Sequence, residues 1–453
     1  FGDTSMKLPR FPVPDGYATN AAYLRELVIE GAKSRWGDPY PAEIAERLKV
    51  EFKTIKEFDV VDYFLIAWDL VTAARGKGFQ MGFGRGSAAG CAISYCLGIT
   101  GVDPIANDLL FERFLNPTRK SMPDIDLDFE IRARPWAHTY LQQRYGIDSV
   151  ALLGTSGMAR SKAAIRSVGR VLNLNDEADA LARLVPMDGA TPIPLAVLLA
   201  PGNCDGEAFR ALMGSDDDHR RIVEISAAIE GRASNRSIHA CGVVIGAQPL
   251  VDQIPMRKAK LSDPTTHWVT EFSGPEVEAA GFLKLDVLGL RNLDVISAAV
   301  RQIERDLVIE SDADNICADP GDPHVVATWR MLAEGRTAGV FQLESPGMTQ
   351  LCIDMAPTSL HHLAALVALY RPGPLGAGMH QRYADRKTGR EEVDYSIFTT
   401  DRSEIDLIGS VLDVTYGVPV YQEQLMQLGS VVAGFDPAWT NRLQKAVSKK
   451  IRD

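Results

Sequence analysis

Several signals that assign a chain to a common protein class are missing from this sequence. No run of about 18 uncharged apolar residues occurs, so the sequence predicts no membrane-spanning helix and no membrane partner. The first residues, Phe1-Gly2-Asp3-Thr4, include no initiator methionine and no basic segment leading into an apolar core. We therefore expect no signal peptide.

The cysteines and histidines also lack the spacings of metal sites and disulfide frameworks. The six cysteines form no CxxC pair, and the eight histidines form neither HExxH nor HxH. Scattered thiols in a long chain are typical of a reducing compartment. The sequence thus predicts a cytoplasmic protein with reduced cysteines, and it gives no support to transition-metal chemistry.

Size and charge set wider limits. A chain of 453 residues is too long for one compact core, so we expect two to four domains. The net charge of −11 argues weakly against a nucleic-acid partner, because neutralising phosphates requires Lys and Arg. A basic groove can coexist with acidic surfaces elsewhere, so the local distribution of charge decides.

The most informative segment is 123–129, Pro-Asp-Ile-Asp-Leu-Asp-Phe. In a β-strand its alternation places Asp124, Asp126 and Asp128 on one face and three apolar side chains on the other. Adjacent carboxylates repel one another, and a hard divalent cation such as Mg²⁺ would compensate them. The alternative is a solvated edge strand that its charges protect against aggregation.

A second acidic strand is predicted over 281–288. Phe282, Lys284 and Asp286 share one face of it. If Asp286 lies beside Asp124 and Asp126, the three carboxylates could hold two divalent ions and support in-line phosphoryl transfer, with Lys284 offsetting phosphate charge. Taken alone, Asp286 would be interpreted as an ordinary residue at a strand end.

A glycine-rich turn over 82–90 leads into a helix of small residues that ends near Leu97. Its backbone amides form a potential phosphate cradle, although the Walker pattern GxxxxGK[ST] is absent. Gly84, Gly86 and Ala89 match the relaxed dinucleotide pattern GxGxx[GA], which raises the alternative of an oxidoreductase. No clear βαβ unit surrounds this match.

Basic residues cluster on two predicted helices. Lys162, Arg166 and Arg170 follow each other at i, i+4 spacing after Arg160, a stripe suited to successive phosphates. The second cluster consists of Arg442, Lys445, Lys449, Lys450 and Arg452. Without the other motifs, the favoured interpretation of either cluster is a solvated helix face.

The remaining pattern is mostly helical. We expect helices over 17–75, almost no strand over 130–230, a strand at 241–245, and helices again from Arg291, interrupted by a turn at 371–374. The shift in composition over 130–230 predicts a separate helical domain.

Ordered motifs along nearly the whole chain closely resemble the C-family DNA polymerases, the family of the bacterial DNA polymerase III alpha subunit. These motifs are Asp62-Tyr63-Phe64-Leu65-Ile66, Gly84-Arg85-Gly86-Ser87-Ala88-Ala89-Gly90, Leu110-Phe111-Glu112-Arg113-Phe114-Leu115-Asn116-Pro117, Ser121-Met122 with the acidic strand, Leu285-Asp286-Val287-Leu288-Gly289-Leu290, Val340-Phe341-Gln342-Leu343-Glu344-Ser345, Arg371-Pro372-Gly373-Pro374 and Tyr421-Gln422-Glu423-Gln424.

The resemblance implies an α+β multidomain fold. Its palm would resemble that of the polymerase β-like nucleotidyltransferases, with a mixed sheet and helices, in two segments, 1–155 and 233–290. A helical thumb would occupy 156–232, and mostly helical, incomplete fingers would occupy 291–453. The family's N-terminal histidine-rich domain and its regions after the fingers have no counterpart in these residues.

The resemblance also implies roles for residues. Asp124, Asp126 and Asp286 would be catalytic and bind two Mg²⁺ ions, for which Mn²⁺ can substitute, with Asp128 in support. The expected triphosphate-binding residues are Arg85, Gly86, Ser87, Arg371, Lys445 and Lys449. The expected DNA-binding residues are Lys162, Arg166, Arg170, His239 and Lys284.

The implied activity is template-directed addition of deoxynucleoside monophosphates to a primer 3′-hydroxyl with release of pyrophosphate. The expected partners are primer-template DNA and dNTPs and, in the full-length family, a sliding clamp, a proofreading exonuclease and clamp-loader subunits. Some positions depart from the family pattern: Gln444 replaces a frequent Arg, and Ser448 replaces a Gly. The alternative is therefore a catalytically incomplete polymerase fragment that binds DNA or replisome partners.

Overall fold

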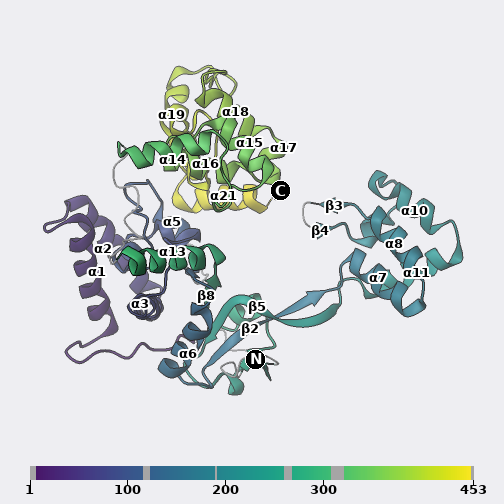
Figure 1. Ribbon diagram of the computed structural model, residues 1–453, viewed down its shortest axis with the longest axis horizontal. Helices are drawn as coiled ribbons and strands as arrows, with labels where there is room; N and C mark the ends of the chain where they lie inside the picture. Colours follow the sequence, from purple (N-terminus) through teal and green to yellow (C-terminus); the bar gives the residue numbers. More distant parts are fainter. Residues whose placement is uncertain (1–6, 116–122, 189–190, 260–267, 308–320, 450–453) are drawn as a thin grey trace. The chain divides into compact units, whose positions relative to one another are not determined.

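The computed structural model describes residues 7–115, 123–188, 191–259, 268–307 and 321–449 (Figure 1). The chain forms two compact units. The first contains Phe1–Lys7 and Tyr145–Lys284, and the second contains Leu8–Arg144 and Leu285–Asp453. Each unit is assembled from segments that are discontinuous in the sequence.

The first part of the second unit is helical around a short pair of strands. Its central helix is α3, whose residues Tyr63, Phe64, Leu65 and Ile66 are fully buried, as expected for a helix that is apolar on every side. The elements are α1 (Asn20–Trp36), α2 (Ala42–Glu57), α3 (Val61–Gly76), η1 (Gly86–Gly90), α4 (Ala92–Cys96), α5 (Phe111–Phe114), β1 (Asp126–Phe129), α6 (Ala133–Tyr145), β8 (Leu283–Gly289) and α13 (Arg291–Leu307). These bounds confirm the helices predicted over 17–75 and the glycine turn that precedes a short helix.

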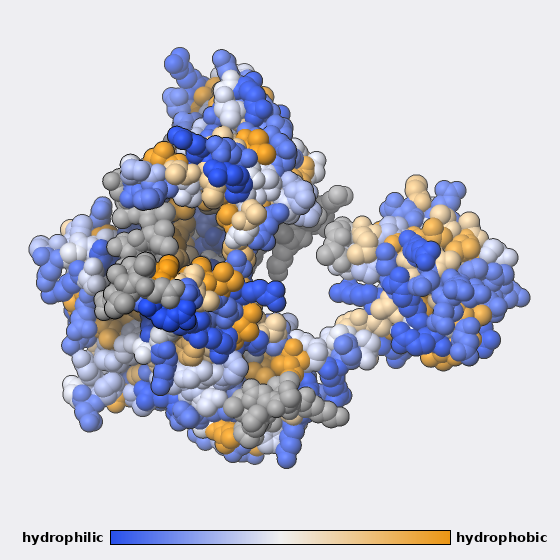
Figure 2. Space-filling model, viewed as in Figure 1, coloured by the Kyte–Doolittle hydropathy of each residue, from blue (hydrophilic) through white to orange (hydrophobic). Residues whose placement is uncertain are grey.

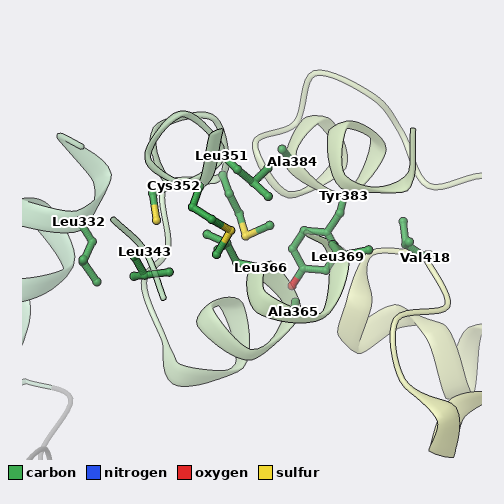
Figure 3. Close-up of a cluster of buried hydrophobic side chains, with 12 residues drawn as sticks. Leu332, Leu343, Leu351, Cys352, Ala365, Leu366, Leu369, Tyr383, Ala384 and Val418 are labelled. Atoms are coloured by element: carbon green, nitrogen blue, oxygen red, sulfur yellow. The ribbon is translucent and has the colours of Figure 1, made fainter. Parts of the chain in front are cut away.

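The rest of the second unit is entirely helical in its described part. Figure 3 shows Leu351, Leu366 and Tyr383 pointing toward one another from α15, α16 and α18 in a buried apolar cluster. The elements are α14 (Pro323–Ala333), α15 (Pro346–Met355), α16 (Leu360–Leu369), α17 (Pro372–Gly376), α18 (Met379–Lys387), α19 (Arg402–Leu412), η4 (Asp413–Thr415), α20 (Gln422–Val431) and α21 (Pro437–Lys449). The predicted turn at 371–374 instead starts α17, because Pro is favoured in the first turn of a helix.

The first unit joins a sheet to a group of helices. In Figure 1 the strands β2 and β5 form a long twisted ribbon that leads to α7, and Figure 2 shows a largely hydrophilic surface on the visible face of the helical group. The elements are β2 (Val150–Met158), α7 (Ser161–Leu172), α8 (Asn175–Leu184), β3 (Met187–Asp188), β4 (Thr191–Pro192), α9 (Leu195–Leu198), η2 (Cys204–Gly206), α10 (Glu207–Met213), α11 (Asp217–Ile229), β5 (Ala233–Ile245), η3 (Leu250–Asp252), β6 (Met256–Lys258), β7 (Trp268–Thr270) and α12 (Gly274–Ala279).

A six-stranded mixed sheet has the order β1-β8-β5-β2-β7-β6, and the boundary between the units falls within β8. β1 pairs with β8 in parallel, β2 pairs with β5 antiparallel and with β7 in parallel, and β6 pairs with β7 antiparallel. The mixed sheet with helices confirms the α+β class. The division into palm, thumb and fingers stays a prediction.

The expectation of almost no strand over 130–230 was wrong for β2. Its first half, Val150–Gly154, is mostly buried, and its second half is polar and more exposed, so the segment shows no simple alternation. Its partner β5 lies far along the sequence and starts at Ala233, before the predicted start at Cys241. Pairing between distant segments therefore decides this strand.

The described residues contain neither a disulfide nor a membrane-spanning helix. No disulfide joins the five cysteines that lie in the described part of the chain, and Cys317 lies outside it. Among the helices of the described residues, none is both long enough and apolar enough to cross a membrane.

Candidate active site

Three carboxylates converge where β1 and β8 lie side by side. The parallel register places Asp126 opposite Asp286, although the two residues are 160 positions apart in the sequence. Side-chain oxygens of Asp124, Asp126 and Asp286 all lie within 4.8 Å of one another. The predicted juxtaposition of the three acids is therefore present, and all three belong to the second unit.

The acidic face of β1 is held in place from its apolar side. Ile125, Leu127 and Phe129 are buried, as their alternation with the acids predicts. Asp124 is exposed, Asp126 is half-buried and Asp286 is only 6% exposed. The solvent exposure of the three carboxylates thus decreases from Asp124 to Asp126 to Asp286.

Tyr63 on α3 fixes the backbone between the first two acids. Its fully buried hydroxyl oxygen accepts a hydrogen bond from the backbone N–H of Ile125 at 2.8 Å. Burial, reinforced by the negative charge of Asp124, raises the pKa of the Tyr63 phenol well above its usual value. The phenol therefore stays neutral beside the acids. The sequence predicted only a helix here. The available signal was a tyrosine within an apolar helix, because a buried tyrosine hydroxyl usually needs a hydrogen-bond partner.

The glycine-rich turn lies directly against the acidic strand. The Gly82 N–H donates to the Asp128 carbonyl at 3.0 Å, and Met81 bridges to Phe129. Gly86 has φ +65°, and a Cβ added there would lie 2.7 Å from Asp126 Oδ2. Any other residue would be strained at this φ and would have to displace the Asp126 carboxylate. The loop that the sequence assigned to phosphate binding is therefore beside the triad, with Ser87 half-buried.

Asp128 links the same turn to the strand by charge. Its carboxylate Oδ1 lies 3.8 Å from Arg85 Nε, and the side chain is 8% exposed. Burial raises the pKa of the Asp128 carboxyl, and the guanidinium of Arg85 partly opposes that rise. Asp128 is therefore placed to orient Arg85, a contact that the alternation of acids alone did not reveal.

The donor set fits a hard divalent cation. Three carboxylates offer oxygen ligands only, at spacings that one or two such ions can bridge, and they repel one another without a positive charge. Mg²⁺ matches this chemistry, and Mn²⁺ accepts the same ligands. β1 is the edge strand of the sheet, as the alternative of a solvated edge strand requires, but three carboxylates converge there and Asp128 is buried, so the acids do not simply face solvent.

The expected triphosphate ligands outside the turn are only partly described. Arg371 is exposed and lies directly before α17. Lys445 and Lys449 lie on α21, but the positions of their side chains fall outside the described part. Their approach to the triad stays a prediction.

The expected DNA-binding residues lie in the first unit. On α7, Lys162 is half-buried, Arg166 and Arg170 are exposed, and Arg166 Nε donates to Asp179 of α8 at 2.7 Å.

The other two expected DNA-binding residues lie on strands. Lys284 Nζ of β8 lies 3.7 Å from Glu278 Oε1. On β5, His239 Nδ1 accepts the N–H of Gly242 at 2.9 Å, which identifies Nε2 as the protonated nitrogen of the neutral ring. Contact with DNA stays a prediction for all five.

Comparisons with known proteins agree with this geometry. Residues 22–289 match the family model of the bacterial DNA polymerase III alpha NTPase domain, and residues 292–453 match that of the bacterial DNA polymerase III alpha subunit finger domain. The chain therefore belongs to the bacterial DNA polymerase III alpha-subunit family.

Curated relatives include the DNA polymerase III subunit alpha of Thermus aquaticus, 38% identical over 98% of this chain and 39% of the relative. That of Bacillus subtilis is 39% identical over 99% of this chain and 38% of its own length. That of Mycobacterium leprae is 38% identical over 99% of this chain and 38% of its own length. The chain thus spans less than two-fifths of the relatives that it matches.

Proposed function

We propose that this chain carries the nucleotidyl-transfer site of a DNA-directed DNA polymerase. The observation that supports the proposal most strongly is the convergence of Asp124, Asp126 and Asp286 beside a glycine turn that approaches Asp126 at Gly86. The reaction would add a deoxynucleoside monophosphate to a primer 3′-hydroxyl under the direction of a template. The relatives carry the name DNA polymerase III subunit alpha, which agrees with this reaction.

The proposed reaction needs no protein side chain as a base to deprotonate the primer 3′-hydroxyl. A bond forms between the primer 3′-oxygen and the α-phosphorus, the bond from the α-phosphorus to the β-phosphate oxygen breaks, pyrophosphate leaves and the hydroxyl proton passes to solvent. Two Mg²⁺ ions bound by the triad would supply a lowered pKa at the hydroxyl and compensation of charge on the leaving group. Asp126 and Asp286, opposite each other on paired strands, would hold both ions.

The glycine turn would bind the triphosphate. The backbone amides at Gly86 and Ser87 lie at the start of η1, where N–H groups lack helical partners and can donate to phosphate oxygens. Arg85, oriented by Asp128, would add positive charge. Arg371, Lys445 and Lys449 would complete the triphosphate contacts.

The first unit would bind the DNA. Lys162, Arg166 and Arg170 on α7 would follow the phosphate backbone of the primer-template, with His239 and Lys284 nearer the primer end. Sliding clamp, proofreading exonuclease and clamp loader would be partners of the larger protein, as in the family.

A second candidate function is that of a DNA-binding or replisome-binding module without turnover. It is favoured by Gln444 and Ser448, which stand where the family pattern has a frequent Arg and a Gly. The complete acidic triad favours catalysis instead, because a module selected only for binding has no need of three converging carboxylates.

The deciding experiment is single-nucleotide primer extension with Mg²⁺. We expect Asp126→Asn to reduce extension about 10³-fold by removing one metal ligand, and the exposed Asp406→Asn on α19 to behave as the unmodified chain. Extension that is unchanged in Asp126→Asn refutes the proposed site. DNA retention in a gel shift without extension by any of these proteins establishes the binding module.

A further inference from the structure

A buried carboxylate on α2 lies behind the glycine turn. Glu51 is 0% exposed and accepts four hydrogen bonds. Oε1 accepts from Arg47 Nε at 2.6 Å and from the Ala92 N–H at 3.1 Å. Oε2 accepts from the Ile93 N–H at 3.0 Å and from Cys91 Sγ at 3.2 Å. A charge at this depth is retained only because every oxygen is satisfied.

Arg47 extends the same network to two other segments. Its Nη2 donates to the carbonyl of Gly90 at 2.9 Å and to that of Leu109 at 3.1 Å. The pair therefore joins the last residue of η1, the start of α4 and the segment before α5. A lysine could make one of these contacts but cannot span them all, because it lacks the planar fork.

The exit of the turn has no spare room. A Cβ on Gly90 would lie 2.7 Å from the Leu110 carbonyl oxygen. A single 3₁₀ segment of five residues runs from Gly86, which approaches Asp126, to Gly90, whose carbonyl accepts a hydrogen bond from Arg47. At a rise of about 2 Å per residue, so short a segment transmits a shift at one end to the other.

We propose that Arg47 and Glu51 are positioning residues that hold the Gly86–Gly90 turn in the geometry that binds the incoming nucleotide. Neither residue touches the triad; each acts through the turn. This inference rests on the proposed role of Gly86 and Ser87 in triphosphate binding. A merely structural ion pair would change stability without a selective loss of nucleotide affinity.

The test measures the apparent Kd for the incoming dNTP in the 453-residue chain, with Mg²⁺ and a dideoxy-terminated primer-template so that no turnover is needed. We expect Arg47→Lys to weaken dNTP binding about tenfold, with DNA affinity unchanged, and to speed hydrogen exchange over 86–93. Lys49→Ala, in the exposed ion pair with Glu46 on the same helix, is the matched control and should change neither. If Arg47→Lys does not fold, Cys91→Ala removes the thiol donor to Glu51, together with the acceptor of the Ser94 N–H at the start of α4, and should weaken binding several-fold.

A double-mutant cycle separates the possible failures. If Arg47 acts through the turn, its effect should largely disappear in a Gly86→Ala background, in which the turn backbone is already displaced, because contacts that share one element are not additive. Fully additive effects, or an unchanged Kd in both Arg47→Lys and Cys91→Ala, overturn the inference alone. An unchanged Kd in Gly86→Ala, which strains the backbone of the turn, instead overturns the triphosphate role of the turn, and the inference with it.

Discussion

At the scale of single residues, Gly86 is subject to two separable constraints. It has φ +65°, which costs an L-residue about 1 kcal/mol, and a Cβ there would have to displace the Asp126 carboxylate. Gly78 has φ +75° and nothing within 4 Å of an added Cβ. We expect Gly86→Ala to lower single-nucleotide addition at least about tenfold, whereas Gly78→Ala lowers only the melting temperature, by a few degrees. Equal activity of the two variants would contradict the close-approach argument.

His362 makes the second unit sensitive to acid. Its Nδ1 accepts the Thr358 N–H at 3.2 Å, and its Nε2 pairs with the Tyr416 hydroxyl at 3.0 Å. Burial, and then the positive charge of Lys387, lowers the pKa of His362 to about 4. In the unfolded chain the imidazole has a pKa near 6.5, so between about pH 4 and 6.5 it binds a proton that it does not bind in the folded chain.

The stability associated with neutral His362 is complete above about pH 6.5 and declines as the pH falls toward 4. Between pH 7 and pH 5 we expect the melting temperature of the unmodified protein to fall further than that of His362→Asn, whose amide oxygen replaces the Nδ1 acceptor. His324→Asn, at an exposed histidine, should follow the unmodified protein. Parallel curves for all three proteins would exclude His362 as the titrating group.

At the scale of elements, the basic stripe of α7 is not uniform. Arg166 is already paired with Asp179, whereas Arg170 is exposed at the end of the helix. If the stripe contacts primer-template phosphates, Arg170→Ala should weaken DNA binding and reduce the slope of log K against log salt by about 1. Arg166→Ala should have a smaller effect, because part of its charge is compensated. Arg221→Ala, on α11 and exposed, is the control, and an equal loss in that variant would argue against a specific stripe.

Elements with a strong local pattern could be predicted from sequence. The alternation of Asp and apolar residues predicted β1 together with its buried face, and continuous apolar character predicted α3. β2 was missed because its polar half is stabilised by β5, a partner some 80 residues away in the sequence. Local propensity carries no information about such a partner.

At the scale of the whole molecule, the triad should couple stability to divalent cations. Without a metal, Asp124, Asp126 and Asp286 repel one another, so Asp126→Asn should melt at a higher temperature than the unmodified protein in a chelator. With millimolar Mg²⁺ the order should reverse, because only the complete site gains free energy by binding. Thermal unfolding in both conditions tests this, with Asp406→Asn as the control. An absent Mg²⁺ shift in the unmodified protein would argue against a metal at the triad.

The site as a whole could be predicted only through the family resemblance. Residues alone indicated two acidic strands, but nothing local requires Asp286 to pair with Asp126. The net charge of −11 pointed weakly away from nucleic acid, since it sums over surfaces that serve different purposes. Contacts such as those of Tyr63 with Ile125 and of Arg85 with Asp128 depend on the tertiary fold and have no signature in sequence spacing.

The parallel pairing of β1 with β8 has a consequence for the chain as it is synthesised. When Asp126 leaves the ribosome, its partner strand is still 160 residues from completion, and the unit containing Tyr145–Lys284 lies between them. A flexible loop of that length would make closure slow and costly in entropy. If the intervening unit folds first, the effective loop becomes shorter. We therefore expect the acidic centre to form only after that unit has folded. A nascent polypeptide would then have no competent centre until nearly two-thirds of these residues had been translated.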